Sequence, residues 1–403
     1  MEKVVVVGGG ASGLVAAIYS ARRGFDVSLV ERYSDCAKKI LVTGNGRCNF
    51  WNSNQKLCYY HSSNADFVSK VITDNNQNEI LNFFSDIGIV SAVKNGYYYP
   101  YSNQAVAIKE ALLIEARLIG VKIINDYEVK KAIWKNDKYI LSDGNRELTC
   151  DYLIIATGSY AYYKEGNNGY DLAHGFGHRI VKVLPSLVQV RGREKYFKNW
   201  AGVRCEVNIT LNSSNEVLKE EYGEILLTDY GASGICVFNV SGIAARLLDK
   251  KEKVFLHINF VPWFDGGDFS SFLERRIQTL GNRKVDEFLE GFLNYKLVYV
   301  ILREAGIDKS LKYTDLSALE RKKLTRFLTD FSFEIVGTNS FDKAQVCTGG
   351  VDTSEVNPVT MESLKSKGLF FAGEILDVDG DCGGYNLSFA WISGMLAGKN
   401  VGD

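Results

Sequence analysis

The chain has 403 residues, of which 46% are apolar and 24% are charged, which is the composition of a globular protein with room for two or three domains. Its 47 Lys and Arg residues balance 48 Asp and Glu residues, so no overall field favours a nucleic acid or an anionic membrane, and neither partner is expected. No apolar run has the length of a membrane span, and a predicted strand starts within about three residues of the N-terminus, which leaves no room for a signal peptide.

The first 31 residues predict a dinucleotide-binding unit. An uninterrupted apolar strand at residues 4–7 is followed by Gly8, Gly10 and Gly13 in GxGxxG spacing, by a helix at 12–23, and by a second strand at 26–30. These glycines permit a tight turn, close approach of a pyrophosphate and packing of the helix on the sheet, while the helix N-terminus attracts the phosphate charge. Glu31 is placed to accept hydrogen bonds from a ribose hydroxyl. This unit by itself leaves open whether the dinucleotide is NAD or FAD.

A polar, glycine-rich segment follows, in which Lys38 and Lys39 precede the sequence TGNGRCN at 43–49, and it predicts a loop. Residues 67–87 predict helices with a break at 75–78, residues 96–101 an aromatic turn, residues 105–118 an amphipathic helix, and residues 121–125 a short strand. Three short strands, at 127–134, 138–141 and 147–150, then lead into a buried strand and small-residue turn at 152–158. Such a meander is unexpected in a plain NAD dehydrogenase and common in flavin-binding proteins of the glutathione reductase superfamily, which favours FAD.

From residue 191 the pattern changes. Alternating apolar residues at 203–211 and further strand candidates at 223–228 and 254–260 indicate an antiparallel β domain, and residues 268–330 then show helical periodicity. The chain returns to the first domain with a buried strand at 368–372, Gly373-Glu374, and a helix at 386–397. In a flavin fold such an acid can bind the ribityl hydroxyls, and the helix N-terminus favours the negative charge that builds on the flavin pyrimidine ring on reduction.

Several motifs together carry a resemblance to a known family. They are the glycines at 8–13, the sequence LVTGNGRCN at 41–49, Ala156-Thr157-Gly158, residues 169–178, Gly349-Gly350-Val351, and above all GLFFAGEILDVDGDCGGYN at 368–386. These segments resemble the BaiN-type bacterial family of flavoproteins, described as NAD(P)/FAD-dependent oxidoreductases, some labelled aminoacetone oxidases. Departures at 96–100 (GYYYP) and 229–235 (DYGASGI) leave the FAD prediction intact and put the substrate in doubt.

The resemblance implies a three-domain α/β flavoprotein. A Rossmann-like FAD-binding domain with a central parallel sheet and a small meander would comprise residues 1–190 and 345–403. It would be interrupted by an antiparallel β-barrel-like domain at 191–265 and 331–344 and by a small helical domain at 266–330. The fingerprint and the resemblance together predict FAD contacts at Gly8, Gly10, Ala11, Ser12, Gly13, Glu31, Arg32, Lys39, Thr43, Asn45, Gly46, Arg47, Cys48, Val129, Ala156, Thr157, Gly158, Gly373, Glu374, Asp377, Gly383, Gly384, Tyr385 and Asn386.

Candidate catalytic residues are Arg47, Cys382 and Tyr385. Arg47 can bind two oxygens at once, although a structural salt bridge is an equal alternative. Cys48 and Cys382 lie in the signature loops and could form a redox pair, but the CxxxxC spacing of disulfide reductases is absent and small buried residues are the default interpretation. The eight cysteines include no CxxC pair, which indicates a reducing, cytoplasmic compartment. His174 and His178 would share a face if their stretch were helical, but packing or surface roles are favoured and no metal is expected.

The sequence therefore predicts an FAD-dependent oxidoreductase that transfers hydride between the flavin and a small organic substrate, with an activated double bond among the possible acceptors. No second GxGxxG follows a strand, so NADH or NADPH, if used, is expected to bind transiently between the flavin domain and the inserted domains. Two alternatives stay open: a flavin-dependent tRNA-modifying enzyme, against which the balanced charge argues, and a non-catalytic flavin redox sensor.

Overall fold

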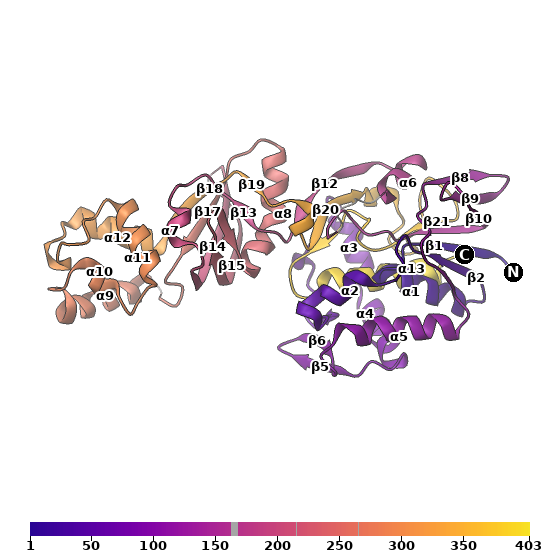
Figure 1. The fold of residues 1–403 in the computed structure, drawn as a ribbon, viewed down its shortest axis with the longest axis horizontal. Coiled ribbons are helices and arrows are strands. Elements are labelled where there is room, and N and C mark those ends of the chain that lie inside the picture. Colours follow the sequence, from indigo (N-terminus) through magenta and orange to yellow (C-terminus); the bar gives the residue numbers. More distant parts are fainter. Residues whose placement is uncertain (163–167, 215, 265) are drawn as a thin grey trace. The chain divides into compact units, whose positions relative to one another are not determined.

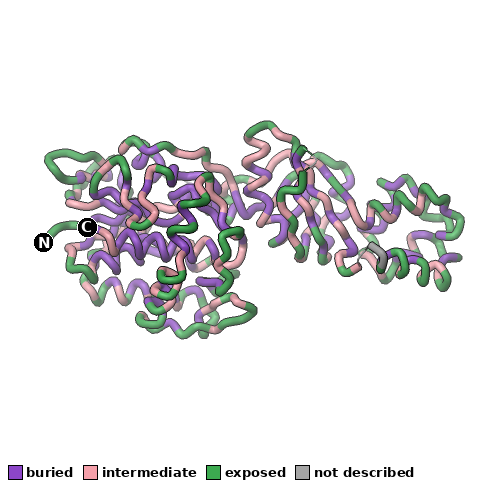
Figure 2. Tube along the Cα trace, turned by 180° about the vertical axis from the view of Figure 1, so that it is seen from behind, coloured by how far each residue is buried: buried purple, intermediate pink, exposed green. Residues whose placement is uncertain are grey.

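The computed structural model describes the chain except for residues 163–167, 215 and 265, and it contains two compact units. Unit 1 consists of Met1–Leu184 and Gln345–Asp403, and unit 2 of Pro185–Ala344. In each unit the buried residues follow the central strands and the helix faces that pack on them (Figure 2). The three-domain division stays a prediction. The ranges predicted for the β-barrel-like and helical domains both fall in unit 2, and residue 265, at their boundary, lies outside the described residues.

Unit 1 is built on a parallel five-stranded sheet in the order β21-β11-β1-β2-β7, which confirms the predicted Rossmann-like α/β fold. β1 (Lys3–Val7) lies in the middle and pairs with β2 (Asp26–Val30) and β11 (Tyr152–Ile155). The edge strands are β21 (Leu369–Phe371) and β7 (Lys122–Ile124). Residues 4–7 of β1 are buried, as expected of a central strand that is covered on both faces.

Two helices from opposite ends of the chain pack against each other in unit 1 (Figure 1): α1 (Ala11–Arg22) and α13 (Tyr385–Lys399). A Cβ added at Gly394 would lie 2.4 Å from the carbonyl oxygen of Ser12, and one at Gly398 would lie 2.4 Å from that of Ala16. The two helix backbones are therefore in direct contact, which only glycine permits at these positions. A third helix, α5 (Ala105–Leu118), also packs on α1 and has the predicted bounds.

The smaller elements of unit 1 correct three predictions. The loop predicted around Lys38 begins with a short helix, α2 (Lys38–Val42), and continues in a 3-10 turn, η1 (Thr43–Gly46). The break in the helical stretch falls at residues 72–73 rather than 75–78, between α3 (Ala65–Val71) and α4 (Asp74–Asp86), because the Thr73 hydroxyl caps α4 by accepting from the Asn76 N–H. The predicted aromatic turn is a strand, β6 (Tyr97–Pro100), which pairs with β5 (Ser91–Lys94) and β3 (Trp51–Asn52).

The remaining elements of unit 1 include the predicted meander, whose first strand begins four residues later than expected. They are β8 (Lys131–Lys135), β9 (Lys138–Ser142) and β10 (Glu147–Cys150), the helix α6 (Gly169–Gly175), the pair β12 (Ile180–Ser186) and β20 (Val346–Val351), the 3-10 turn η5 (Thr353–Glu355), and the antiparallel pair β4 (Tyr60–His61) and β22 (Asp379–Gly380).

Unit 2 contains a seven-stranded antiparallel sheet in the order β18-β17-β14-β15-β16-β13-β19. Its strands are β13 (Val190–Arg191), β14 (Arg204–Ser213), β15 (Glu216–Leu227), β16 (Gly231–Ser233), β17 (Val254–Asn259), β18 (Phe331–Ile335) and β19 (Gly337–Thr338). Its helices are α7 (Phe197–Trp200), α8 (Ile235–Asp249), α9 (Gly266–Leu280), α10 (Val285–Leu289), α11 (Tyr295–Ala305) and α12 (Ala318–Thr329).

The prediction that the block from residue 191 contains only strands is wrong in one place, because this block includes the 15-residue helix α8. The apolar stripe predicted from Val285 to Leu293 also belongs to a shorter helix, since α10 ends at Leu289. The strands and the helices of unit 2 share one hydrophobic core, to which Ile209, Leu256, Phe288 and Ile301 all contribute. In the described part of the chain, no helix has both the length and the apolarity that a membrane crossing requires.

Candidate functional site

The glycine-rich turn after β1 brings three backbone segments into contact. Gly8 has a φ of +107°, and a Cβ at this position would lie 2.5 Å from the carbonyl oxygen of Ala156, at the end of β11. A Cβ at Gly13 would lie 1.9 Å from the carbonyl oxygen of Gly8. Strand, turn and helix therefore approach one another as closely as their backbones allow, and the predicted Ala156-Thr157-Gly158 turn lies beside the GxGxxG turn.

The N-terminus of α1 is open to an approaching anion. Its N-cap is Gly10, which has no side chain to cap the helix, and the first turn contains no acidic residue. A Cβ at Gly10 would meet no described atom within 4 Å. Half-buried Ala11 begins the helix, and the hydroxyl of Ser12 donates to the carbonyl oxygen of Ala372 at 3.2 Å. The first turn is thus uncapped and has room beside Gly10, which fits a pyrophosphate.

Glu31 is held in place at the end of β2. Its carboxylate accepts hydrogen bonds from the N–H of Gly9 at 2.7 Å and from that of Tyr33 at 3.0 Å. Burial raises the pKa of Glu31, and the two N–H groups partly oppose that shift. The guanidinium of Arg32 bonds the Tyr33 hydroxyl at 2.7 Å, and buried Val129 uses its carbonyl oxygen to accept from Asn168. The carboxylate for which the sequence predicts a ribose contact is therefore fixed by its own backbone neighbours.

The loop at 43–49 has an unusual backbone. Gly44, Asn45, Gly46 and Cys48 all have positive φ angles, between +54° and +81°, and a cysteine rarely adopts that conformation. Two hydrogen bonds close the turn. The Thr43 hydroxyl donates to the carbonyl oxygen of Ile40 at 2.6 Å, and the N–H of Cys48 donates to the carbonyl oxygen of Thr43 at 3.0 Å. Asn45, Gly46 and Arg47 are exposed. Such strain is typical of segments whose backbone contacts a ligand.

Side chains at the end of this loop differ in what they can do. Arg47 is exposed and lies with its guanidinium carbon 5.2 Å from the ring centroid of Tyr99, so it packs on an aromatic face, and it forms no salt bridge with any described residue. Cys48 is fully buried, and burial raises the pKa of its thiol to about 12, which disfavours a reactive thiolate. The eight cysteines, all within the described residues, are free thiols, so Cys48 and Cys382 are not joined in a disulfide.

Asn49 is a residue that the sequence-based prediction omitted. Its Oδ1 atom is buried and, among the described residues, has no hydrogen-bond partner. The same side chain lies at the N-terminus of α13, because a Cβ at Gly384 would be 3.4 Å from the Asn49 Cγ. A buried amide oxygen without a partner is costly, so a ligand that donates to it at this position would be favoured. The signal in the sequence was its place at the end of TGNGRCN.

The C-terminal motif joins this site through Glu374. Its carboxylate accepts from the ammonium of Lys39 at 2.6 Å, from the hydroxyl of Ser159 at 2.7 Å and from the N–H of Cys347 at 3.1 Å. Gly373, with a φ of +78°, lies against Ser12, whose hydroxyl would be 2.3 Å from an added Cβ. The structure therefore brings together Ser12 with Gly373 and Lys39 with Glu374, which the sequence had predicted only as members of one site.

The segment that precedes α13 forms a rigid cap. Gly383 and Gly384 have φ angles of +137° and +98°, and Gly384 is the N-cap of α13 without a capping side chain. The Asn386 side chain accepts from the N–H of Gly380 at 2.8 Å and donates to its carbonyl oxygen at 2.7 Å. Half-buried Cys382 lies in the short segment between Gly380 and Asn386, which these two hydrogen bonds close into a loop. The backbone is thus fixed around a second helix N-terminus that has no capping side chain.

Residues 59–63 cover this cap and were missed by the sequence-based prediction. The ring of Tyr59 stacks on that of Tyr385 with centroids 4.8 Å apart, and β4 pairs with β22. The N–H of Ser63 donates to buried Asp377 at 3.0 Å. Tyr385, a predicted catalytic residue, is only 5% exposed, and burial raises the pKa of its hydroxyl. A catalytic role for Arg47, Cys382 or Tyr385 stays a prediction.

The residues present fit FAD at both ends. The uncapped N-terminus of α1 and the buried Glu31 suit a pyrophosphate and a ribose. The Oδ1 of Asn49, which has no described partner, and the uncapped N-terminus of α13 suit a polar ring edge. Because these features come from one unit of the chain, a single extended dinucleotide could contact all of them.

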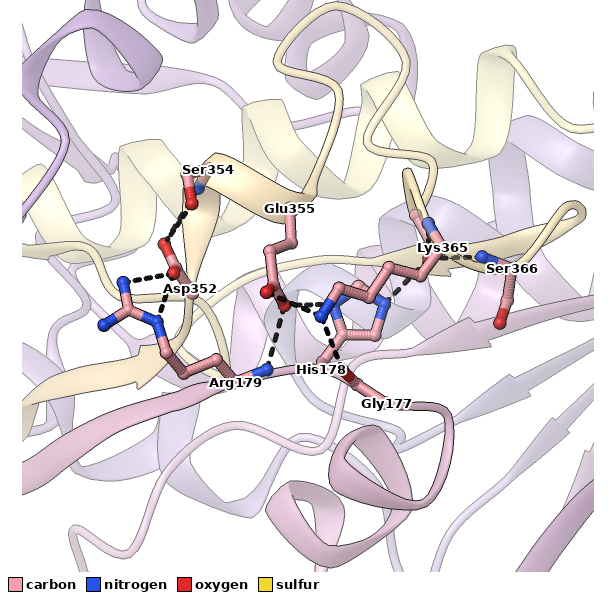
Figure 3. Close-up of polar contacts among 9 residues, drawn as sticks. Gly177, His178, Arg179, Asp352, Ser354, Glu355, Lys365 and Ser366 are labelled. Atoms are coloured by element: carbon pink, nitrogen blue, oxygen red, sulfur yellow. Dashed lines mark hydrogen bonds and ion pairs between the residues drawn. The ribbon is translucent and has the colours of Figure 1, made fainter.

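His174 and His178 do not share a helix face, because α6 ends at Gly175 and only the exposed His174 lies on it. His178 is buried in a separate polar cluster (Figure 3). Its Nε2 lies 2.7 Å from the Ser363 hydroxyl, which accepts from the N–H groups of Lys365 and Ser366 at 3.0 and 2.9 Å. Because its oxygen already accepts two hydrogen bonds, the Ser363 hydroxyl donates one to Nε2. Nε2 then carries no proton, and the single ring proton is on Nδ1, which lies 3.4 Å from a carboxylate oxygen of Glu355. This neutral histidine packs edge-on against Phe371 in β21.

Comparison with known proteins gives consistent matches over the whole chain. The family model described as HI0933-like protein Rossmann domain matches residues 2–400. A protein of Clostridium scindens named 3-dehydro-bile acid delta(4,6)-reductase is 35% identical over 99% of this chain and 98% of its own length. Proteins named ribosomal RNA dihydrouridine synthase from Haemophilus influenzae and Escherichia coli are 30% and 28% identical, each over 98% of this chain and over 98% and 97% of their own lengths.

Proposed function

The chain belongs to the HI0933-like Rossmann-domain family of flavoprotein oxidoreductases, and we propose that it binds FAD and reduces a carbon–carbon double bond conjugated to a carbonyl group. The observation that carries this proposal is what the names of its relatives share. A delta(4,6)-reductase and a dihydrouridine synthase both, by name, saturate a ring double bond, although their substrates differ greatly in size. A common reaction on different molecules is what a fold with a fixed cofactor site and a variable substrate surface would produce.

The reduced flavin would supply the hydride for this reaction, and the residues of unit 1 would position it. The N-terminus of α1 would bind the pyrophosphate, and Glu31 would accept from the adenosine ribose. Lys39 and Glu374 would border the ribityl chain, and the N-terminus of α13 would stabilise negative charge at the pyrimidine end of the ring system.

We propose a nicotinamide coenzyme, NADH or NADPH, as the electron donor, bound only transiently. We further propose a small-molecule substrate and a cytoplasmic location; the eight free thiols are consistent with a reducing compartment.

An anaerobic spectroscopic experiment tests this function. Purified protein would be loaded with FAD, and the flavin absorbance near about 450 nm would be followed after addition of NADH or NADPH and then of a cyclic enone. We expect bleaching by one coenzyme and recovery of the oxidised spectrum with the enone. A protein that does not bind FAD would contradict the proposal outright. A flavin that is reduced but is not reoxidised by any enone would point to the redox-sensor alternative.

A second candidate function is the synthesis of dihydrouridine in ribosomal RNA, which the 30% and 28% identical relatives favour. It is the same reaction on a polynucleotide. The balanced charge of the chain weighs against tight RNA binding, although a local surface could provide it. Mass spectrometry of nucleosides from the ribosomal RNA of a deletion strain would decide between the two, because loss of one dihydrouridine assigns this function.

A further inference from the structure

A histidine and an aspartate meet beside the N-terminus of α13. His61 lies on β4 and points its Nε2 at Asp381, whose Oδ1 is 2.8 Å away. The side chain of Asp381 is 3% exposed and that of His61 is 21% exposed, so the pair has a buried anchor and an accessible ring. This geometry orients the imidazole and leaves Nδ1 as the nitrogen that can exchange protons.

The backbone fixes this pair next to the cap of α13. Asp381 directly follows β22, and its N–H donates to the carbonyl oxygen of Tyr59 at 2.9 Å. Asp379 is the cross-strand neighbour of His61, and Gly380 is held by both side-chain groups of Asn386. Asp381 therefore lies two residues before Gly383, in the loop that leads to the N-terminus of α13, and its backbone is tied to the segment that precedes β4.

Of the other titratable side chains in unit 1, Cys48, Tyr385, His178 and His174 are poorly suited to donate a proton at this loop. Cys48 is fully buried, and the pKa of its thiol is raised to about 12. Tyr385 is stacked on Tyr59, and burial raises the pKa of its hydroxyl. His178 is committed to the Ser363 and Glu355 network, and His174 is exposed on α6. His61, in contrast, has a partly exposed ring that a buried carboxylate holds in one orientation, which is the arrangement of a general acid.

We propose that His61, oriented by Asp381, donates the proton that completes the reduction of the double bond. This inference rests on the proposed function. In the step, bound FAD in its reduced form would supply the hydride to one carbon of the double bond and would itself be oxidised, while the adjacent carbon would receive the proton from Nδ1 of the His61 imidazolium. The double bond becomes a single bond, the imidazole is left neutral, and solvent returns its proton. His61 is then a catalytic residue and Asp381 a positioning residue.

The test has one readout that needs no substrate. Protein labelled with ¹³C at the histidine Cε1 and loaded with FAD would be titrated by NMR, first oxidised and then reduced by dithionite, with His61→Gln used to assign the resonance. Because reduction adds negative charge to the flavin, the midpoint of the His61 titration should move to higher pH by about one unit if the ring adjoins it. A midpoint that is the same in both states would overturn the proposal.

The second readout is the anaerobic reoxidation of the reduced flavin by cyclohex-2-enone and by 4-androstene-3,17-dione. His61→Gln should slow reoxidation at least about 100-fold, since general acids contribute about 10² to 10⁴ in rate. Asp381→Asn should shift the pH–rate profile to lower pH, because a neutral amide no longer favours the imidazolium, and a merely structural role would not move it. His174→Gln is the matched control and should behave as wild type, with FAD content measured in every variant.

The outcomes separate the two proposals. If His61→Gln is reoxidised as fast as wild type, His61 is not the proton donor, while the proposed double-bond reduction stands. If the wild-type flavin is not reoxidised by either enone although the His61 titration responds to reduction, the double-bond function and the proton transfer both fail, and His61 is retained only as a proton-exchanging group at the flavin.

Discussion

Lys39 and Glu374 lie 335 positions apart in the chain and form an ion pair of 2.6 Å. The pair connects the segment that follows Glu31, the proposed ribose-binding acid, with the Gly-Glu motif after β21. Its side chains are 26% and 17% exposed, so it is partly shielded from water. The two halves of the proposed FAD site are therefore held together by charge as well as by the contact of α1 with α13.

This ion pair should contribute more to stability than a comparable exposed pair. Lys39→Met would leave the Glu374 carboxylate without its cation, which we expect to cost about 1–3 kcal/mol. Lys122→Met is the matched control, because Lys122 pairs with Asp26 at 2.7 Å but is itself 63% exposed, and its loss should cost about 0–1 kcal/mol. Calorimetric melting of both variants measures the difference, and equal decreases in Tm would contradict this expectation.

Two glycines of the fingerprint should differ in what they support. Gly13→Ala would place a Cβ 1.9 Å from the carbonyl oxygen of Gly8, so we expect the fold of unit 1 to be severely destabilised. At Gly10, where φ is −83° and the added Cβ meets open space, alanine should leave the melting temperature nearly unchanged. It should nevertheless lower FAD affinity about tenfold or more by filling the place of the pyrophosphate. Unaltered FAD binding by Gly10→Ala, measured by fluorescence titration, would show that the pyrophosphate lies elsewhere.

Asn49→Leu separates cofactor binding from folding. Because the Oδ1 of Asn49 is buried without a described partner, replacing the amide by an apolar side chain of similar size should leave the stability of the FAD-free protein unchanged or increase it. The same change should weaken FAD binding, since leucine has no oxygen that could accept a hydrogen bond from the flavin ring. If FAD stabilises the variant and the wild type by the same amount in thermal melts, Asn49 has no role in cofactor binding.

The buried His178 makes a prediction about pH. Burial lowers the pKa of His178 in the folded protein below its value of about 6.5 in an unfolded chain. The unfolded state then binds more protons as the pH falls below about 6.5, so the stability that neutral His178 contributes is complete above that pH and is lost below it. We expect Tm to fall between pH 7.5 and 5.5, and less so in His178→Gln. His174 is exposed, so the His174→Gln variant should keep the wild-type dependence of Tm on pH. If His174→Gln instead reduces the fall in Tm, His178 is not the group responsible.

Alkylation tests the dithiol alternative. A thiol with a pKa of about 12 has roughly one thiolate in 10⁵ molecules at pH 7, so Cys48 should resist iodoacetamide in the folded protein. The exposed Cys58 should react first. Mass spectrometry of the modified peptides locates the label, and a Cys48→Ala, Cys382→Ala double variant that loses flavin reduction while retaining FAD would restore the dithiol mechanism.

The sequence predicted the βαβ unit from Lys3 to Val30 because its signals are local: a strand, three spaced glycines and a helix within one short stretch. The helix α8 was missed although its pattern was present, since Cys236, Val237, Val240, Ser241 and Ala244 are buried with helical spacing. Its β-branched residues and the neighbouring strands favoured a β interpretation.

The pairs that define the candidate site could not be predicted in the same way. Asn49 meets Gly384, and His61 meets Asp381, across more than three hundred residues of chain. Asp381 lies in the C-terminal signature at 368–386, but His61 has no motif around it, and β4 is only two residues long, too short for periodicity to reveal. Such contacts depend on the register of β4 with β22 and on the packing of α13, which are properties of the assembled fold.

The contact of Gly394 and Gly398 with α1 has a consequence for biosynthesis. On the ribosome, α1 emerges early and α13 only after all of unit 2 has been made. A nascent chain therefore holds the apolar surface of α1 uncovered throughout elongation, while unit 2, which is continuous in sequence, can fold as soon as it leaves the exit tunnel. If FAD binds as proposed, its capture would wait for translation of α13, so a ribosome stalled before Tyr385 would carry a folded unit 2 and a colourless unit 1.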